Sequence, residues 1–293
     1  MRFSVLIPTL NRAELLKCCI ESLLAQTFSD FEIIVVDQSD DAMVDSSIEH
    51  MDSRICYLRI TERGLSHARN IGITHARGEY ICLGDDDATF SPSVLEIADS
   101  ILKKDSPSIL GGKLVDPSTG IARSDSTDTW VSWGTAFKYL VSPGMFIEKN
   151  LLVEHPFDEQ FGVGAPFGCG EETDVVLYAL KEGRRVLYAD KYTILHHVDR
   201  GNLPEVERVK SYSYGYGALC RKCTREYSFS WGLHYFLRTI AGNAVLGNIV
   251  LPFTDRQAAA VRRARAAQTW RGFWAFRAES GIEYVGTDNS LQG

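Results

Sequence analysis

The chain has 293 residues, 45% of them hydrophobic, so it is long and apolar enough to fold around a sizeable core. Its formal net charge is −7 and it contains no long basic run, which argues against a protein whose main partner is nucleic acid. Its seven cysteines follow no disulfide framework, which indicates reduced thiols and a cytoplasmic location.

The first ninety residues alternate between strand and helix patterns. Helical spacing of apolar residues covers 13–25 and 65–76. Strand patterns cover 5–7, where we expect Pro8 to end the strand, and then 31–36, 55–60 and 80–84. Because parallel strands need a crossover that is usually helical, this alternation predicts a doubly wound parallel sheet.

Three consecutive carboxylates, Asp85, Asp86 and Asp87, follow the strand pattern at 80–84. The carboxyl end of a parallel strand is where open α/β sheets bind ligands. Three adjacent like charges are unfavourable unless a cation neutralises them, and a hard divalent cation prefers carboxylate oxygens. The triplet therefore indicates a metal site, with a solvated acidic turn as the alternative.

The pattern loosens between residues 105 and 170 into Gly, Pro and Ser with interleaved aromatics, which predicts a pocket built from loops. A helix over 171–182 and a strand over 185–188 follow, and the chain is largely helical after Pro204. Residues 231–253 are apolar but include Arg238. Its burial at a bilayer centre costs roughly 2.5–3.5 kcal/mol, so we expect core packing or docking at a membrane interface rather than spanning.

One pair of cysteines has the spacing of a metal or redox motif. Cys220 and Cys223 form a CxxC. No second CxxC completes a zinc site, and the segment lacks a thioredoxin-like strand context. We interpret both thiols as structural.

Several motifs occur in a recognisable order: SVLIPTLNR at 4–12, VVDQSD at 35–40, RGLSHARN at 63–70, the aspartate triplet, GCGEETD at 168–174, and His196-His197. This order resembles glycosyltransferase family 2, the inverting enzymes of GT-A fold that use nucleotide sugars. The resemblance covers roughly residues 2–200. It implies an α/β fold, a Rossmann-like three-layer sandwich with a mixed, mostly parallel sheet, plus a C-terminal helical region. A looser match, WRGFW at 270–274, is similar to the tail of bacterial polysaccharide-assembly members.

The resemblance implies a donor site at the carboxyl ends of the strands. It assigns Asp37 to the uracil ring, because a carboxylate accepts a hydrogen bond from an imide N–H. Thr9 and Arg12 lie beside the same nucleotide in this reading. Arg69 has a planar fork of donors suited to phosphate or base contacts, with a salt bridge as the alternative. The remaining implied donor-binding residues are Pro8, Asn11, Asp85, Asp86 and Gly144.

A divalent cation, Mn²⁺ or Mg²⁺, is also implied by the resemblance. Its ligands would be Asp85 and Asp87, with His196 favoured over His197 as a further ligand. Ala88 stands where many relatives have a fourth acidic residue.

The general base of the family is typically the Asp of a Glu-Asp pair, and the aligned pair is Glu171-Glu172. The resemblance therefore implies Glu172 as the base, with Asp174 as a rival. The alternative to a catalytic role for this cluster is a helix N-terminus whose acidic residues complement the helix dipole.

We expect a cytoplasmic, metal-dependent, inverting glycosyltransferase of polysaccharide biosynthesis that moves a sugar from a UDP-type donor to a saccharide or lipid-linked saccharide. The expected domains are 1–204, with a nucleotide-binding half at 1–104 and an acceptor half at 105–204, and a helical extension at 205–293. A peripheral position at the inner face of the cell membrane stays open. The alternatives are a sugar nucleotidyltransferase, whose basic Gly-rich loop is missing, and a non-catalytic nucleotide-binding scaffold.

Overall fold

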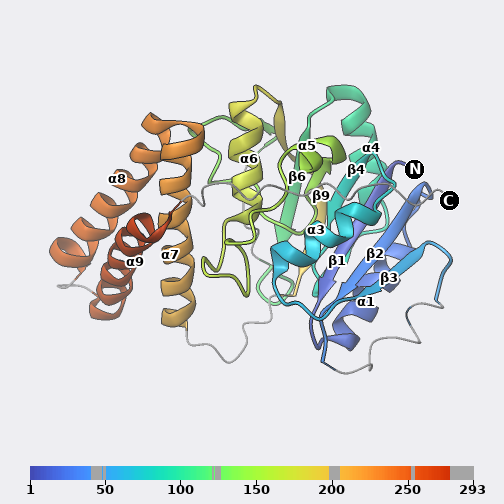
Figure 1. The fold of residues 1–293 in the computed structure, drawn as a ribbon, viewed down its shortest axis with the longest axis horizontal. Coiled ribbons are helices and arrows are strands. Elements are labelled where there is room, and N and C mark those ends of the chain that lie inside the picture. The colour runs from blue at the N-terminus through green and yellow to red at the C-terminus, as the bar shows by residue number, and fades with distance from the viewer. Residues whose placement is uncertain are drawn as a thin grey trace, which may run out of the picture.

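The computed structural model describes residues 1–40, 48, 51–120, 122, 127–197, 205–251 and 255–277. A sheet flanked by helices occupies one end of the molecule, and three long helices, α7, α8 and α9, gather at the other (Figure 1). The domain boundary that we expected at residue 204 lies outside the described residues.

The sheet is mixed. Within the described residues it has nine strands in the order β3-β2-β1-β4-β8-β6-β9-β5, and β7 also pairs with β9. Strands β3, β2, β1 and β4 are parallel, whereas β8 is antiparallel to both β4 and β6. The strand bounds are β1 Phe3–Thr9, β2 Phe31–Asp37, β3 Ile55–Arg59, β4 Tyr80–Leu83, β5 Ala88–Phe90, β6 Ile109–Val115, β7 Thr129–Trp130, β8 Phe146–Glu148 and β9 Val186–His196.

Helices cover both faces of the sheet. The α-helices are α1 Ala13–Leu24, α3 Leu65–His75, α4 Val94–Asp105, α5 Lys149–Glu154, α6 Glu171–Lys181, α7 Glu205–Lys222, α8 Phe229–Val245 and α9 Arg256–Ala275. Two π-helical segments, η2 Cys223–Tyr227 and η3 Leu246–Val250, follow α7 and α8.

Alternate side chains of the strands build two separate cores, because successive residues of a strand point to opposite faces. Leu6 and Ile34 face the core that includes α3, α5 and α6. Val5 and Ile33 face the core that includes α1 and α4. The result confirms the three-layer α/β sandwich that the resemblance implied.

The expectation that Pro8 ends the first strand is wrong, since β1 continues to Thr9. The carbonyl of Leu6 accepts a hydrogen bond from Gly84 N, so the backbone polar groups of Leu6 point toward the β4 side of the strand. The backbone of Pro8, two residues further on, faces the same side. Strand β4 has already ended at Leu83 on that side. The missing N–H of Pro8 therefore leaves no bond of the sheet unmade.

The region between residues 105 and 170 contains more regular structure than its composition suggested. It contributes β6 and β8 to the middle of the sheet and α5 to one face. Strand β9 is also longer than expected, and it extends to His196. This extra length brings the side chain of His196 to the end of β4.

The C-terminal helices pack on one another and on α6 through small and aromatic residues. Cys220 and Cys223 are both buried there, and burial raises the pKa of each thiol, to about 12 for Cys223. This environment suits the structural role that we expected. No helix in the described part of the chain combines the length and hydropathy needed to cross a membrane.

Candidate active site

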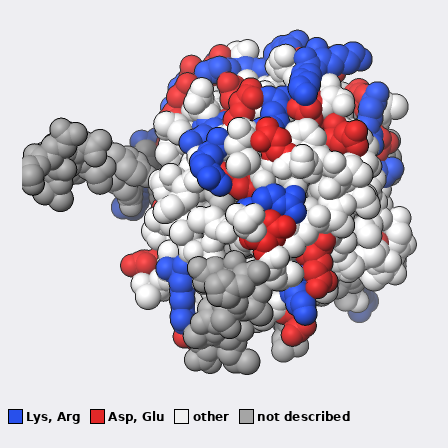
Figure 2. Space-filling model, turned by 90° about the vertical axis from the view of Figure 1, so that its right-hand side faces the viewer, with Lys and Arg blue, Asp and Glu red and all other residues white. Residues whose placement is uncertain are grey.

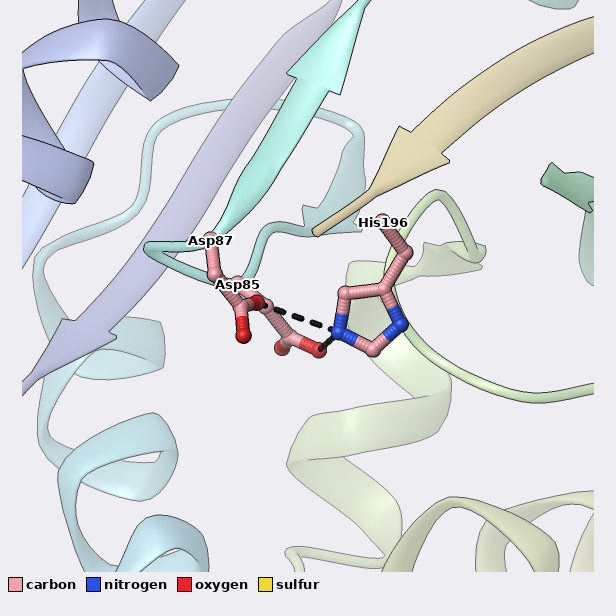
Figure 3. A group of neighbouring side chains, drawn as sticks. All are labelled: Asp85, Asp87 and His196. Atoms are coloured by element: carbon pink, nitrogen blue, oxygen red, sulfur yellow. Dashed lines mark ion pairs between the residues drawn. The ribbon is translucent and has the colours of Figure 1, made fainter. Parts of the chain in front are cut away.

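The aspartate triplet forms the turn between β4 and β5. Strand β5 pairs antiparallel with β9, and the register sets Ala88 opposite His196. This pairing brings His196 to Asp85 and Asp87, as Figure 3 shows. His196 Nε2 lies 3.1 Å from Asp87 Oδ1 and 3.8 Å from Asp85 Oδ2. The neighbouring His197 turns away and contacts Thr89 Oγ1 through its Nε2 atom at 3.1 Å.

These three side chains fit a divalent cation. One ligand atom from each of Asp85, Asp87 and His196 lies within 4.8 Å of the other two. Adjacent ligands of an octahedral Mg²⁺, with bonds of about 2.1 Å, are about 3.0 Å apart, close to the 3.1 Å contact of Asp87 with His196. Burial raises the pKa of Asp85 although the charge of Arg69 opposes the shift. A bound cation would favour its ionised form.

The middle carboxylate of the triplet points elsewhere. Asp86 accepts hydrogen bonds from Thr9 Oγ1 at 2.8 Å and from Arg12 Nη1 at 3.2 Å. Arg12 Nη1 also lies 3.5 Å from Asp87 Oδ2. Asp86 therefore ties the loop after β1 to the turn after β4, and its expected contact with the donor would compete with these bonds.

The loop after β1 is also tied to the end of β2. Asn11 donates its backbone N–H to Ser39 Oγ at 2.8 Å, and its side chain contacts Asp40. Asp37 is 0% exposed, and it accepts hydrogen bonds from Ser39 N at 2.9 Å, Ser39 Oγ at 2.5 Å and Tyr57 Oη at 2.5 Å. A carboxylate has about four acceptor positions, so three of those of Asp37 are occupied within the protein.

Arg69 links the metal-site carboxylates to the helix that carries the acidic cluster. It is 0% exposed, and it donates to Asp85 Oδ1 at 3.3 Å, Glu171 Oε1 at 3.0 Å and Ser142 Oγ at 3.0 Å. The salt-bridge alternative for Arg69 therefore agrees with the structure. Both terminal nitrogens of Arg69 are thus engaged within the protein, which suits a positioning role, while its Nε has no hydrogen-bond partner among the described residues.

The two glutamates at the start of α6 differ in their partners. Glu171 is bound to Arg69, whereas Glu172 Oε2 is buried and has no hydrogen-bond partner among the described residues. Burial raises the pKa of Glu172 to about 8, and the charge of Glu171 adds to the shift. A poorly solvated carboxylate with a raised pKa has the properties of a general base.

The surroundings of Asp174 favour a structural role over that of a base. Its side chain is 0% exposed and contacts Lys222 Nζ at 2.9 Å, Tyr227 Oη at 2.7 Å and His155 Nε2 at 3.0 Å. Although burial alone would raise the pKa of Asp174, the charge of Lys222 brings it below its ordinary value. A fully paired carboxylate with a lowered pKa is a weak proton acceptor.

Gly144 serves packing within the protein. Its φ is +83°, and a Cβ at this position would lie 2.0 Å from Ile194 Cδ1. Its N–H donates to Leu83 O at 2.7 Å, and its carbonyl accepts from Tyr192 Oη at 3.0 Å. The structure thus explains this glycine without a sugar beside it.

Ser142, Tyr57 and Lys222 were not singled out from the sequence. Ser142 binds Arg69, Tyr57 binds Asp37, and Lys222 binds Asp174. Lys222 follows Arg221 in the last turn of α7, where basic residues are ordinary, so its sequence context gives no signal. All three residues lie far from their partners in sequence and are recognised only in the folded chain.

The fold is the one that the resemblance to glycosyltransferase family 2 implied. A family model described as Glycosyl transferase family 2 matches residues 4–150. The chain belongs to this family.

Two curated relatives are glycosyltransferases by name. The uncharacterized glycosyltransferase EpsJ of Bacillus subtilis is 27% identical over 232 residues, which are 69% of this chain and 63% of the relative. The PGL/p-HBAD biosynthesis glycosyltransferase of Mycobacterium tuberculosis is 30% identical over 141 residues, 46% of this chain and 51% of the relative. The chain spans between 13% and 63% of the length of the first curated relatives that it matches.

Solved structures share the fold at low sequence identity. Mannosyltransferase PcManGT from Pyrobaculum calidifontis, in complex with GDP-Man and Mn²⁺, has a TM-score of 0.64 and 17% identity over 92% of this chain and 87% of that one. S. aureus TarS 1-349, in complex with UDP, has a TM-score of 0.57 and 17% identity over 93% of this chain and 89% of that one.

Proposed function

We propose that the protein transfers a sugar, with inversion, from a nucleoside diphosphate sugar to a hydroxyl of a saccharide or lipid-linked saccharide. The donor is of the UDP type, and the reaction serves polysaccharide biosynthesis in the cytoplasm. The observation that carries the proposal is the grouping of Asp85, Asp87 and His196 with the Arg69–Glu171 pair, where Glu171 is followed in the chain by Glu172, whose Oε2 is buried without a hydrogen-bond partner among the described residues. A cation site and a base on one sheet edge are what displacement of a diphosphate requires.

The donor would bind across the carboxyl ends of β1, β2 and β4. Asp85, Asp87 and His196 would hold Mn²⁺ or Mg²⁺, which supplies positive charge to the leaving diphosphate. Arg12 is 38% exposed beside the same carboxylates, so its guanidinium suits an outer phosphate oxygen. The UDP complex of TarS supports a uridine donor. Because PcManGT is in complex with GDP-Man, a guanosine donor is the alternative to test.

Glu172 would act as the base. Its Oε2 accepts the proton of the attacking hydroxyl as the new oxygen–carbon bond forms at the anomeric carbon. The bond from that carbon to the diphosphate breaks on the opposite side, and the nucleoside diphosphate leaves with the electron pair. A single displacement of this kind inverts the anomeric centre.

The division of labour along the chain is part of the proposal. Residues 1–104 would bind the nucleotide, residues 105–204 would bind the acceptor, and the extension from residue 205 would complete the structure around α6. The contact of Lys222 with Asp174 on α6 supports this role for the extension.

The test is turnover of a donor panel by the purified chain. Release of UDP or GDP is measured from UDP-sugars and GDP-mannose with Mn²⁺ present, for the wild type and Glu172→Gln. We expect one donor class to be turned over and Glu172→Gln to lower kcat by about 100-fold or more, the usual contribution of a general base. Glu182→Gln, at the other end of α6, is the matched control and should leave kcat unchanged.

Two results would contradict the proposal. Full activity of Glu172→Gln would remove Glu172 from the base role. Tight UDP binding without turnover of any donor would favour the non-catalytic scaffold.

A further inference from the structure

The outward side of α9 carries arginines and tryptophans in one line. Arg256, Arg263, Trp270, Arg271 and Trp274 recur at spacings that put them on one helix face, which we call the α9 ridge. All five are exposed, Trp270 to 51% and Trp274 to 56%. At 1.5 Å per residue the ridge is about 27 Å long.

The charge of this region opposes that of the whole protein. Residues 229–277 contain seven arginines and one aspartate, whereas the chain as a whole has a net charge of −7. In the part of the chain that the structure describes, no arginine of α9 forms an ion pair with a carboxylate. Arg262 binds Asn243 and Arg263 binds the carbonyl of Gly247 instead.

The other end of the molecule looks different. Figure 2 shows Lys and Arg interspersed with Asp and Glu over the end that lies opposite α8 and α9 in Figure 1. Along residues 229–277, by contrast, Asp255 is the one acidic residue, so positive charge predominates in the sequence of α8 and α9. Such a segregated charge attracts a polyanionic surface.

Exposed apolar side chains accompany the arginines. Leu237, Val245 and Ile249, on α8 and η3, are 53%, 48% and 63% exposed, and the two tryptophans of the α9 ridge add aromatic surface. Large apolar side chains in water are unfavourable, and tryptophan beside arginine is typical of helices that lie at the boundary of headgroups and acyl chains. A nucleic acid or an acidic protein would satisfy the arginines but leave the aliphatic side chains without an apolar medium.

We propose that the α9 ridge docks the protein on a bilayer that contains anionic phospholipids. The arginines contact headgroup phosphates, and Trp270 and Trp274 enter the interface beside them. Contact is peripheral, at the level of the headgroups. Docking at this end would bring a lipid-linked acceptor to the same molecule, so it deepens the proposed function, although binding to the bilayer does not itself depend on the reaction.

The test is co-sedimentation of the full chain with vesicles of phosphatidylcholine alone and with added phosphatidylglycerol. Each arginine near an anionic surface contributes about fivefold to partitioning, so we expect Arg263→Gln/Arg271→Gln to weaken binding by about 25-fold. Trp270→Ala/Trp274→Ala should weaken the binding that persists in high salt. Arg54→Gln/Arg184→Gln, which removes two ion-paired arginines elsewhere, is the matched control and should bind as the wild type does.

The outcomes separate this inference from the proposed function. Donor turnover without vesicles should be the same in all four proteins, since none of these residues touches the active site. Equal binding to neutral and anionic vesicles, no binding at all, or full binding by the double arginine variant would overturn the proposal. A wild-type dimer that the same substitutions dissociate, without lipid binding, would assign the α9 ridge to a second copy of the chain instead.

Discussion

Lys222 on α7 and Asp174 on α6 form an ion pair that is closed to solvent. The Nζ and Oδ2 atoms are 2.9 Å apart, and the residues are 4% and 0% exposed. Lys222 also contacts Asp158 Oδ2 at 2.6 Å. Because Glu172 is only two residues from Asp174 on the same helix, the C-terminal helices fix the orientation of the helix that carries the candidate base.

Replacing Lys222 by methionine should destabilise the protein by about 3–5 kcal/mol, since it leaves the Asp174 carboxylate buried without its cation. Urea unfolding measures this loss. In the fraction that still folds, kcat per UDP-binding site should fall, because α6 is less well fixed. Calorimetric UDP titration counts those sites.

Lys210→Met is the control for this substitution. Lys210 lies on the same helix but pairs with Glu207 at the surface, where an ion pair contributes about 0–1 kcal/mol. If Lys222→Met were as stable and as active as Lys210→Met, the ion pair would have no part in holding α6.

Arg69→Lys should lower kcat by roughly 10- to 150-fold. Lysine keeps the charge, but it cannot bridge Asp85, Glu171 and Ser142 as the guanidinium does, and losing a hydrogen bond to a charged group costs about 1.5–3 kcal/mol. Steady-state donor turnover measures the effect. Arg77→Lys, at an arginine paired with the buried Glu32 outside the site, should leave kcat unchanged. Equal rates for the two variants would contradict the positioning role of Arg69.

The reaction should depend on pH through Glu172. Burial raises the pKa of this carboxyl to about 8, and only the deprotonated form accepts a proton. Activity is therefore present above this pKa and is lost as the pH falls through it, by about tenfold per pH unit. The pH profile of kcat/KM measures this acidic limb, the fall in activity below the pKa. A profile that stays flat down to the ordinary glutamate range would contradict a buried base, and the residual activity of Glu172→Gln should lack the limb.

Gly144→Ala should destabilise the protein more than Gly183→Ala. Both glycines have positive φ, +83° and +68°, so alanine costs each about 1–2 kcal/mol in backbone strain. Only Gly144 also meets Ile194, and overpacking adds about 1–3 kcal/mol. The difference in unfolding free energy between the two variants isolates the contact with Ile194. Equal losses would mean that β9 yields to the added methyl.

The sequence predicts the parallel half of the sheet because its strands are short β-branched runs between amphipathic helices. It also predicts that Asp85 and Asp87 stand at the carboxyl end of a strand. These are local patterns, and such a pattern predicts the structure correctly when the strand is buried on both faces. Strand β6 escapes detection because of its two glycines, and β8 because it has only three residues.

Local sequence patterns do not predict contacts between segments that are distant in the chain. His196 reaches Asp87 because β9 pairs with β5, and the resemblance to a known family, rather than periodicity, pointed to it. Asp174 and Glu172 look equivalent in sequence. They face different neighbours because residues two apart on a helix lie on different sides of it. Only the folded chain shows that Asp174 is paired with Lys222, Tyr227 and His155, whereas Glu172 Oε2 has no hydrogen-bond partner among the described residues.

In the proposed reaction, Asp85, Asp87 and His196 hold the cation to which the donor diphosphate binds. Calorimetric titration of UDP into the purified wild type and Asp87→Ala, each with and without Mn²⁺, tests this metal site. We expect UDP to bind the wild type tightly only when Mn²⁺ is present, and Asp87→Ala to abolish this dependence while the protein stays folded. UDP binding that is equally tight without the cation, or that keeps its full Mn²⁺ dependence in Asp87→Ala, would contradict it.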